Sequence, residues 1–262
     1  MTVEVRRILR ELRDGRISLE EAERRLKLLP ILQVEDYVRM DLGRERRRSI
    51  PEIVYAQGKQ TSQLLKLARE VAEAEGRVII ARAREDQLAA LVRLKPKFEV
   101  EAWRGAGLAV VRRKGFRTVK TGGKVAVLTA GTADIPVAVE AEVVAGEMGC
   151  EVYHAYDVGV AGFHRLLEPL KKISGWADVV VVVAGMEGAL PSVVASLLDI
   201  PVIGVPSSVG YGYGGGGRAA LMSMLQTCSL GLAVVNVDNG VGAGAIAALI
   251  ANRVAMARGE KA

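Results

Sequence analysis

Two hydrophobic patterns divide the chain near residue 120. Up to that point, apolar residues recur at helical spacing, as over residues 3–13, or alternate with polar residues, as over residues 98–103. Beyond it, short apolar runs such as residues 179–183 do not alternate, which is typical of strands that are covered on both faces. The chain is therefore predicted to contain a smaller α+β domain over residues 1–120 and an α/β domain over residues 121–262.

The N-terminal domain is predicted to mix helices and strands. Ser18 with Glu21 forms a capping box that begins a second helix, and Pro30 closes that segment. Thr61 and Ser62 can cap a third helix. The predicted elements are helices over residues 3–13, 18–29, 61–75 and 87–94 and strands over residues 78–80, 98–103 and 108–111.

Beyond residue 120, short apolar runs alternate regularly with helical segments. The predicted strands cover residues 125–128, 152–156, 179–183, 202–205 and 233–237, and the predicted helices cover residues 136–148, 163–173, 190–198, 219–228 and 243–256. Each connection is long enough for a right-handed crossover between parallel strands. This order predicts a five-stranded, doubly wound parallel sheet of the flavodoxin-like type.

Composition narrows the class of protein. Of the 262 residues, 50% are hydrophobic and 25% are charged, which excludes a disordered chain. The two cysteines, Cys150 and Cys228, are too few for a disulfide framework or a zinc cage, so a reducing, cytoplasmic setting is expected. The N-terminus is charged, and no run approaches the roughly 18 apolar residues of a membrane span, so we expect neither secretion nor a membrane partner.

The net charge of +6 is unevenly distributed. Residues 1–120 hold 28 Lys and Arg against 18 Asp and Glu, a net of +10, whereas residues 121–262 hold 8 against 12, a net of −4. Aromatic residues are not interleaved with the arginines as they are in a surface that stacks bases, so nucleic acid is not expected as a partner. The basic stretch over residues 43–48 has two interpretations, a solvated loop or an anion-binding segment.

Small and polar residues follow every predicted strand of the parallel sheet. They occupy residues 130–134, 157–165, 185–188, 206–208 and 238–240. Ligands of such sheets bind beyond the carboxyl ends of the strands, where backbone N–H groups and helix N-termini favour a phosphate or carboxylate. The sequence therefore predicts an anion-binding site at this edge of the sheet.

A glycine-rich loop over residues 210–217 imitates a dinucleotide fingerprint. Gly212, Gly214 and Gly217 fit the spacing GxGxxG, and Asp238 follows about twenty residues later. The tight turn of that fingerprint must follow its strand directly, yet residues 206–211 intervene here. We interpret the loop as a lid or a close-packed loop, and we expect no redox cofactor.

The two cysteines and two histidines carry weaker signals. Cys228 has two interpretations from the residues alone, a buried small hydrophobe or a functional thiol, whereas Cys150, between a helix and a strand, is interpreted as structural. His164 and the second histidine have no metal-ligand partner at helical spacing, so no zinc motif is predicted.

Two of the edge motifs resemble a known enzyme family. Residues 131–134 (GTAD) and residues 184–191 (AGMEGALP) resemble the nucleotide site of the aminoimidazole ribonucleotide carboxylases of purine synthesis. Those enzymes carry a functional histidine just before the Leu-Pro of the second motif, where this chain has Ala189. The departure argues against carboxylation of a purine precursor.

A longer set of motifs resembles the LarB family. It comprises residues 51–55 (PEIVY) with Gly58-Lys59, residues 157–167 (DVGVAGFHRLL), 184–191, 206–212 (PSSVGYG), 223–228 (SMLQTC) and 236–240 (NVDNG). LarB is the carboxylase/hydrolase that begins synthesis of the nickel-pincer nucleotide. The resemblance covers most of the chain.

The resemblance implies a specific reaction. Nicotinic acid adenine dinucleotide is carboxylated on its pyridinium ring by CO2, and its phosphoanhydride is hydrolysed to give pyridinium-3,5-biscarboxylic acid mononucleotide and AMP. An electron-poor pyridinium carbon does not attack CO2, but addition of a thiolate makes the ring nucleophilic. The family's transient cysteinyl-pyridine adduct carries over onto Cys228. The resemblance also implies a homo-oligomer, with an octamer as one form, and a divalent cation such as Mg2+ whose protein ligands the sequence does not identify.

Other roles are assigned to the strand-end motifs. Either Glu187 or Asp134 is expected to take the ring proton or to help hold the metal. The candidate substrate-binding residues are Gly131, Thr132, His164, Arg165, Gly185, Met186, Gly188, Ser207, Ser208, Asp238 and Asn239. Two alternatives remain open, a nucleotide-binding regulatory protein on the same fold and a nicotinamide-dependent oxidoreductase.

Overall fold

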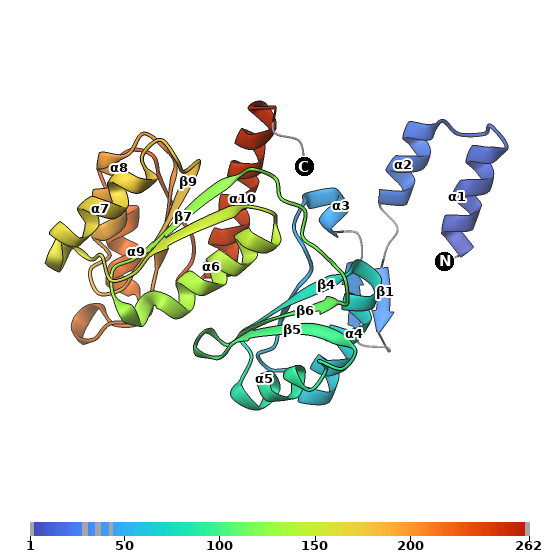
Figure 1. Cartoon of the computed structure of the whole chain (residues 1–262), viewed down its shortest axis with the longest axis horizontal. Helices are drawn as coiled ribbons and strands as arrows, with labels where there is room; N and C mark the ends of the chain where they lie inside the picture. The colour runs from blue at the N-terminus through green and yellow to red at the C-terminus, as the bar shows by residue number, and fades with distance from the viewer. Residues whose placement is uncertain (1–2, 28–30, 35–37, 42–43, 260–262) are drawn as a thin grey trace.

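Two large β-sheets organise the chain, as Figure 1 shows, and a third sheet has only two antiparallel strands, residues 31–34 and 38–41. The computed structural model describes residues 3–27, 31–34, 38–41 and 44–259. Its N-terminal elements are α1 (Val3–Arg13), α2 (Leu19–Lys27), β1 (Ile31–Val34), β2 (Val38–Asp41), α3 (Arg44–Arg48), β3 (Ile53–Tyr55), α4 (Thr61–Glu75), β4 (Arg77–Ala81), α5 (Glu85–Val92), β5 (Phe98–Trp103), the 3-10 turn η1 (Arg104–Ala106) and β6 (Leu108–Arg113). Helices α1 and α2 form a hairpin set apart from both sheets (Figure 1).

A mixed four-stranded sheet forms the centre of the N-terminal part, in the order β3-β4-β6-β5. The α+β prediction is confirmed, but three details differ. Helix α4 begins at Thr61, and Gln60 rather than Thr61 or Ser62 occupies its N-cap, where its backbone N–H donates to Gln63 Oε1 at 3.3 Å. Within the basic stretch, residues 44–48 form helix α3 instead of a loop. The short strands β1, β2 and β3 were not predicted, and Pro30 and Gly43 lie outside the described residues.

The second sheet is parallel throughout and has the order β11-β10-β9-β7-β8, which confirms the predicted flavodoxin-like topology. Its elements are β7 (Lys124–Thr129), η2 (Thr132–Asp134), α6 (Ile135–Glu147), β8 (Glu151–Ala155), η3 (Val160–Gly162), α7 (His164–Ile173), β9 (Val179–Ala184), α8 (Leu190–Leu197), β10 (Val202–Pro206), η4 (Gly212–Gly214), α9 (Arg218–Leu225), β11 (Leu232–Val234) and α10 (Gly240–Ala257).

Two predicted elements of this sheet are too long. Strand β11 ends at Val234 rather than Val237, although Val235 N and Asp238 N still donate to carbonyl oxygens of β10. Helix α9 ends at Leu225 rather than Cys228. Just beyond α9, Thr227 Oγ1 accepts a hydrogen bond from Ser229 N at 3.1 Å, and such a local side-chain turn competes with further helix.

Three hydrophobic clusters stack the elements into layers. One cluster packs α7, α8 and α9 against one face of the parallel sheet, and a second packs α6 and α10 against the other face. The second cluster also takes in Ile79 and Leu108 of the four-stranded sheet, whereas Val78 and Ile80 turn the opposite way into a third cluster under α4 and α5. Helices α6 and α10 are therefore buried between the two sheets.

Helix α10, which was predicted over residues 243–256, is unusually apolar. It covers 18 residues with a mean hydropathy of 1.5, enough by length and composition for a membrane span. Half of it is buried inside the protein, and Val241, Ala243 and Ala247 belong to the cluster between the sheets. This is the position of a core helix.

Close packing of α6 on α10 gives a first prediction. A Cβ at Gly244 would lie 2.7 Å from Cα of Ala141, closer than real Cβ atoms come. Gly244→Ala should therefore destabilise the fold by about 1–3 kcal/mol, as overpacking does. Gly146 near the end of α6 has nothing within 4 Å, so Gly146→Ala should stabilise by about 0.4–1 kcal/mol. Chemical denaturation measures the unfolding free energy of both variants, and equal changes in the two would contradict the close packing at Gly244.

Candidate active site

A cavity of about 310 Å³ lies at the carboxyl ends of β7, β8, β9 and β10. It is centred on the boundary between β7 and β9, where the direction of strand order reverses and where doubly wound sheets bind ligands. Its lining comes from residues 130–134, 157–165 and 184–190, together with Val209. The cavity thus lies at the edge of the sheet where the sequence predicts an anion-binding site.

Asp134 is the buried acid of this cavity, with 3% of its surface exposed. Its Oδ2 atom accepts a hydrogen bond from Gly131 N at 2.9 Å, while its Oδ1 atom is buried and has no hydrogen-bond partner of standard geometry. Burial raises the pKa of Asp134, and hydrogen bonding by the Gly131 N–H, the Ser207 hydroxyl and the Gly185 N–H partly counters this rise. A buried carboxylate whose pKa is raised can accept a proton or hold a polar ligand.

The rim of the cavity carries strained backbone. Asp157, Met186 and Asp238 have φ values of 57°, 49° and 56°, in the left-handed region that residues other than glycine rarely adopt. Each lies in a connection after a strand of the parallel sheet. Such strain costs about 1–3 kcal/mol per residue and is concentrated at functional sites.

Two glycines let the edge loops approach one another. A Cβ at Gly159 would lie 2.5 Å from the carbonyl oxygen of Ala130, and a Cβ at Gly185 would collide with the carbonyl oxygen of Val209. The same carbonyl of Val209 accepts a hydrogen bond from Met186 N at 3.0 Å. The connections after β7, β8, β9 and β10 therefore form one continuous rim.

Side chains next to this rim hydrogen-bond to its backbone and to the start of α10. Asp238 Oδ1 accepts a hydrogen bond from Ser208 N at 2.7 Å, and Ser207 Oγ accepts one from Val209 N at 3.2 Å. Asn239 Oδ1 caps α10 by accepting from Gly242 N at 2.9 Å. These side-chain oxygens therefore already accept hydrogen bonds from the protein's own backbone.

The structure brings together part of the predicted set. Six of the candidates line the cavity: Gly131, Asp134, Arg165, Gly185, Met186 and Glu187. Five lie behind the rim or beside it: Gly188, Ser207, Ser208, Asp238 and Asn239. Thr132 and His164 are exposed and do not line the cavity. Glu187 is exposed at the rim, whereas Asp134 is buried.

Cys228 lies at the opposite end of the parallel strands from this cavity. It follows the end of α9 and precedes β11, and nearby Gly231 accepts a hydrogen bond from Val202 N at the start of β10. The five residues of β10 separate the two ends by roughly 13 Å. Cys228 is exposed in a single copy of the chain, and that copy does not bring its thiol to Asp134.

Several residues at the site were not among the candidates. Asp157 lines the cavity and forms an ion pair with Arg165, and it carries the same signal as the others because it follows β8. Arg82, from the N-terminal sheet, pairs with Glu140 of α6 at 3.0 Å and donates a hydrogen bond to the carbonyl oxygen of Asp238. No local pattern signals this contact, because it joins the two parts of the chain.

Glu140 gives a prediction about pH. Burial raises its pKa from 4.5 to about 7, although Arg82 counters the rise. Because the folded pKa exceeds the unfolded one, this group's stabilisation is fully present below pH 4.5 and is lost as the pH rises through 7, by roughly 3 kcal/mol. The unfolding free energy of the wild type should therefore decline between pH 4.5 and 8, and Glu140→Gln should remove the part of this decline that Glu140 causes.

Chemical denaturation at several pH values measures this difference. Glu168→Gln is the matched control, because the Glu168 side chain is 82% exposed and should leave the pH dependence unchanged. Identical pH profiles for the wild type and Glu140→Gln would contradict the assignment.

The cavity does not form a preassembled metal centre. Within the described ranges, no three or more histidine, cysteine or acidic side chains are grouped so as to hold a metal ion. Asp157 is engaged by Arg165, and Asp134 accepts a hydrogen bond from Gly131 N. The described side chains therefore do not preassemble a site that would hold Mg2+ without substrate phosphates.

Comparison with known proteins agrees with this geometry. Residues 124–261 match the AIR carboxylase family, and residues 32–109 match the LarB/PurE-like N-terminal domain. An uncharacterised protein of Methanocaldococcus jannaschii is 42% identical over 252 residues, which cover 94% of this chain and 96% of that protein. The N5-carboxyaminoimidazole ribonucleotide mutase of the same organism is 32% identical over 126 residues, which cover 47% of this chain and 75% of the mutase. With a LarB-like N-terminal domain followed by an AIR carboxylase-like domain, the chain belongs to the LarB family.

Proposed function

We propose that this carboxylase-type protein carboxylates the pyridinium ring of nicotinic acid adenine dinucleotide and hydrolyses its phosphoanhydride. The products are pyridinium-3,5-biscarboxylic acid mononucleotide and AMP. The observation that carries the proposal is the acid–base character of the cavity. Ala189 lines it where the purine carboxylases have their histidine, which leaves Asp134 as the buried carboxylate of the lining. A carboxylate suits the removal of a ring proton.

The covalent step is assigned to Cys228. Its thiolate adds to a ring carbon, a C–S bond forms, and the ring becomes a neutral dienamine. The electron-rich ring carbon then attacks CO2 and forms a C–C bond. The hydrogen on that carbon leaves as a proton to Asp134 or Glu187, and the C–S bond breaks, so that the thiolate departs and the ring regains its aromaticity.

The position of Cys228 requires a second copy of the chain. Met222, Leu225 and Leu230 are 70%, 66% and 92% exposed, so Cys228 is bordered by apolar side chains without a partner in one copy. Packing this surface against the cavity of another copy would bury apolar area and deliver the thiol to Asp134. We propose a homo-oligomer on this ground, and the family resemblance makes an octamer the form to test first.

Substrate binding is assigned to the rim. Arg165 presents its guanidinium at the cavity mouth, where it can form bidentate hydrogen bonds with a phosphate or with the carboxylate of the pyridine ring. Its partner Asp157 holds it in place through the ion pair. No step is assigned to Mg2+, because no metal site is preassembled among the side chains that the structure describes.

One incubation tests the proposal. The purified chain is mixed with nicotinic acid adenine dinucleotide, bicarbonate and Mg2+, and mass spectrometry follows AMP and the dicarboxylated mononucleotide. Formation of both supports the proposal, and no product from a folded wild type overturns it. A nicotinamide-dependent oxidoreductase would instead change the absorbance of NAD(P)H with a carbonyl substrate, and a regulatory protein would return the dinucleotide unchanged.

A further inference from the structure

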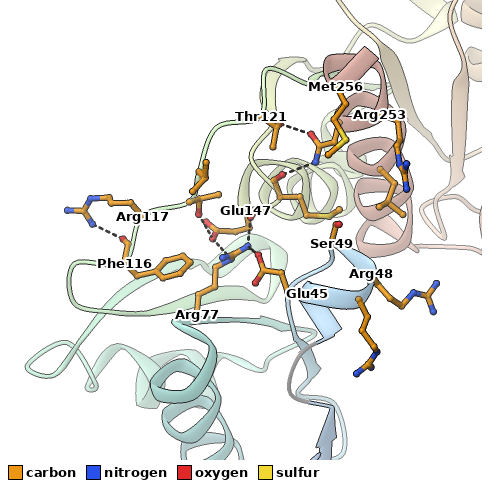
Figure 2. A pocket seen from close by; sticks show the side chains of 16 residues that line it. Glu45, Arg48, Ser49, Arg77, Phe116, Arg117, Thr121, Glu147, Arg253 and Met256 are labelled. Atoms are coloured by element: carbon orange, nitrogen blue, oxygen red, sulfur yellow. Dashed lines mark hydrogen bonds and ion pairs between the residues drawn. The ribbon is translucent and has the colours of Figure 1, made fainter. Parts of the chain in front are cut away.

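A second and larger cavity, of about 720 Å³, lies between the two parts of the chain (Figure 2). Its walls come from α3, from residues 116–121 and from the C-terminal ends of α6 and α10. These segments meet at the amino ends of the parallel strands, so the cavity is at the opposite end of the strands from Asp134. The proposed reaction makes no use of it.

The floor of this cavity is electrically balanced. Arg77 is only 4% exposed, and it pairs with Glu45 at 2.8 Å and with Glu147 at 3.2 Å. It also donates to the backbone carbonyl of Glu147 at 2.7 Å and lies 4.9 Å from the ring centre of Phe116. Arg112 pairs with the same Glu147 and with Glu101. Two arginines thus face three glutamates, and this network has no positive charge to spare.

The wall formed by α3 and α10 is not balanced. Arg48 ends α3, Arg253 lies on α10, and Figure 2 places both on the same side of the cavity. In the described ranges, neither has a carboxylate or hydrogen-bond partner. Ser49 lies between the two helices in Figure 2 and has a strained φ of 56°. Two unpaired guanidinium groups and a hydroxyl are a set suited to a phosphate.

An apolar surface adjoins these cations. Met148, Leu249 and Met256 line the same cavity, and Met256 is 64% exposed. Methionine side chains adapt to flat aromatic groups, and a cavity of this volume is large enough for a nucleotide. Charge and apolar surface together favour a ligand with a planar group at one end and a phosphate at the other.

We propose that this second cavity binds an organic phosphate of the nucleoside monophosphate class. Arg48, Arg253 and Ser49 hold the phosphate, and the base packs on Met148, Leu249 and Met256. This assignment selects the anion-binding interpretation of the basic stretch that forms α3. It concerns binding alone and stands whether or not the chain carboxylates a pyridinium ring.

Titration calorimetry of the full chain with AMP tests the proposal, with inorganic phosphate and adenosine as separate ligands. We expect saturable binding of AMP, weaker binding of each fragment, and at least about a tenfold rise in Kd for the double variant Arg48→Gln/Arg253→Gln. The matched control is Arg69→Gln/Arg93→Gln, which removes two exposed arginines elsewhere and should leave Kd unchanged.

Arg165→Gln separates this cavity from the first one. If AMP occupies the second cavity, Arg165→Gln keeps that binding event and the Arg48/Arg253 variant loses it. The proposal is overturned by the absence of saturable binding, by an unchanged Kd in the Arg48/Arg253 variant, or by loss of all binding in Arg165→Gln alone. Circular dichroism of each variant checks that it folds.

Discussion

Cys228→Ala is expected to abolish formation of the dicarboxylated mononucleotide, with a loss of roughly 10³-fold or more, as when a covalent nucleophile is removed. The thiol is exposed, so its removal should leave the fold intact. Mass spectrometry of the reaction mixture measures the loss. An active Cys228→Ala variant would defeat the covalent mechanism.

Cys150→Ala is the matched control for this variant. Cys150 is buried, and its thiol lies 3.2 Å from Asn252 Oδ1. Burial raises the pKa of Cys150 to about 11, so at neutral pH the thiol stays protonated and is a poor nucleophile. We expect Cys150→Ala to keep its activity and to lose some stability, the reverse of Cys228→Ala.

A mixing experiment tests the contribution of a second copy. Cys228→Ala chains have an intact Asp134 and no thiol, whereas Asp134→Asn chains have the reverse. If each site takes Asp134 from one copy and Cys228 from another, the mixed oligomers should recover about a quarter of the wild-type activity, since half of the pairs are mixed and each holds one complete site. No recovery in oligomers shown to be mixed would place the thiol and the acid in the same copy.

Asp134→Asn is expected to reduce kcat by roughly 10²–10⁴-fold, as the loss of a general base does, while KM changes little. The amide keeps the shape of the side chain and can still accept the hydrogen bond from Gly131 N. Because burial raises the pKa of Asp134, its ionised form costs stability at neutral pH, and the neutral amide should not lower the unfolding free energy. Steady-state kinetics and chemical denaturation together test this combination.

Asp14→Asn is the control for the same change at an exposed position. Asp14 lies just after α1 and pairs with Arg13 and Arg16, far along the chain from the cavity. It should leave both kcat and KM unchanged. A wild-type kcat in Asp134→Asn would contradict the role of Asp134 and would indicate that Glu187, the other candidate, removes the ring proton.

The parallel sheet was predictable because its strands are buried on both faces. Residues 179–183 form an uninterrupted valine run, and the observed strand β9 extends it by one residue. Strands β1, β2 and β3 are three or four residues long, too short for a periodic pattern to show. The end of α9 was missed because a local turn at Thr227 forms three residues or fewer before the predicted end of the helix.

The candidate site was predictable where it depends on topology. Asp134, Gly185 and Glu187 follow strands β7 and β9, and parallel strands bring such residues to one edge. Cys228 follows a helix and precedes a strand, so the same rule places it at the other edge. Arg82 and Glu140 are 58 residues apart in the sequence and lie in different domains. Periodicity and capping motifs report only on neighbouring residues, so they could not predict this contact.

The hydrophobic cluster that α6 and α10 share with the four-stranded sheet limits how the chain can be divided. If the protein were cut in the connection between β6 and β7, Ile79 and Leu108 on one fragment, and Val137 and Val241 on the other, would all lose their cover. Each fragment would then present a wide apolar face to water, which favours aggregation. In this chain the two parts are therefore expected to unfold as a single cooperative unit.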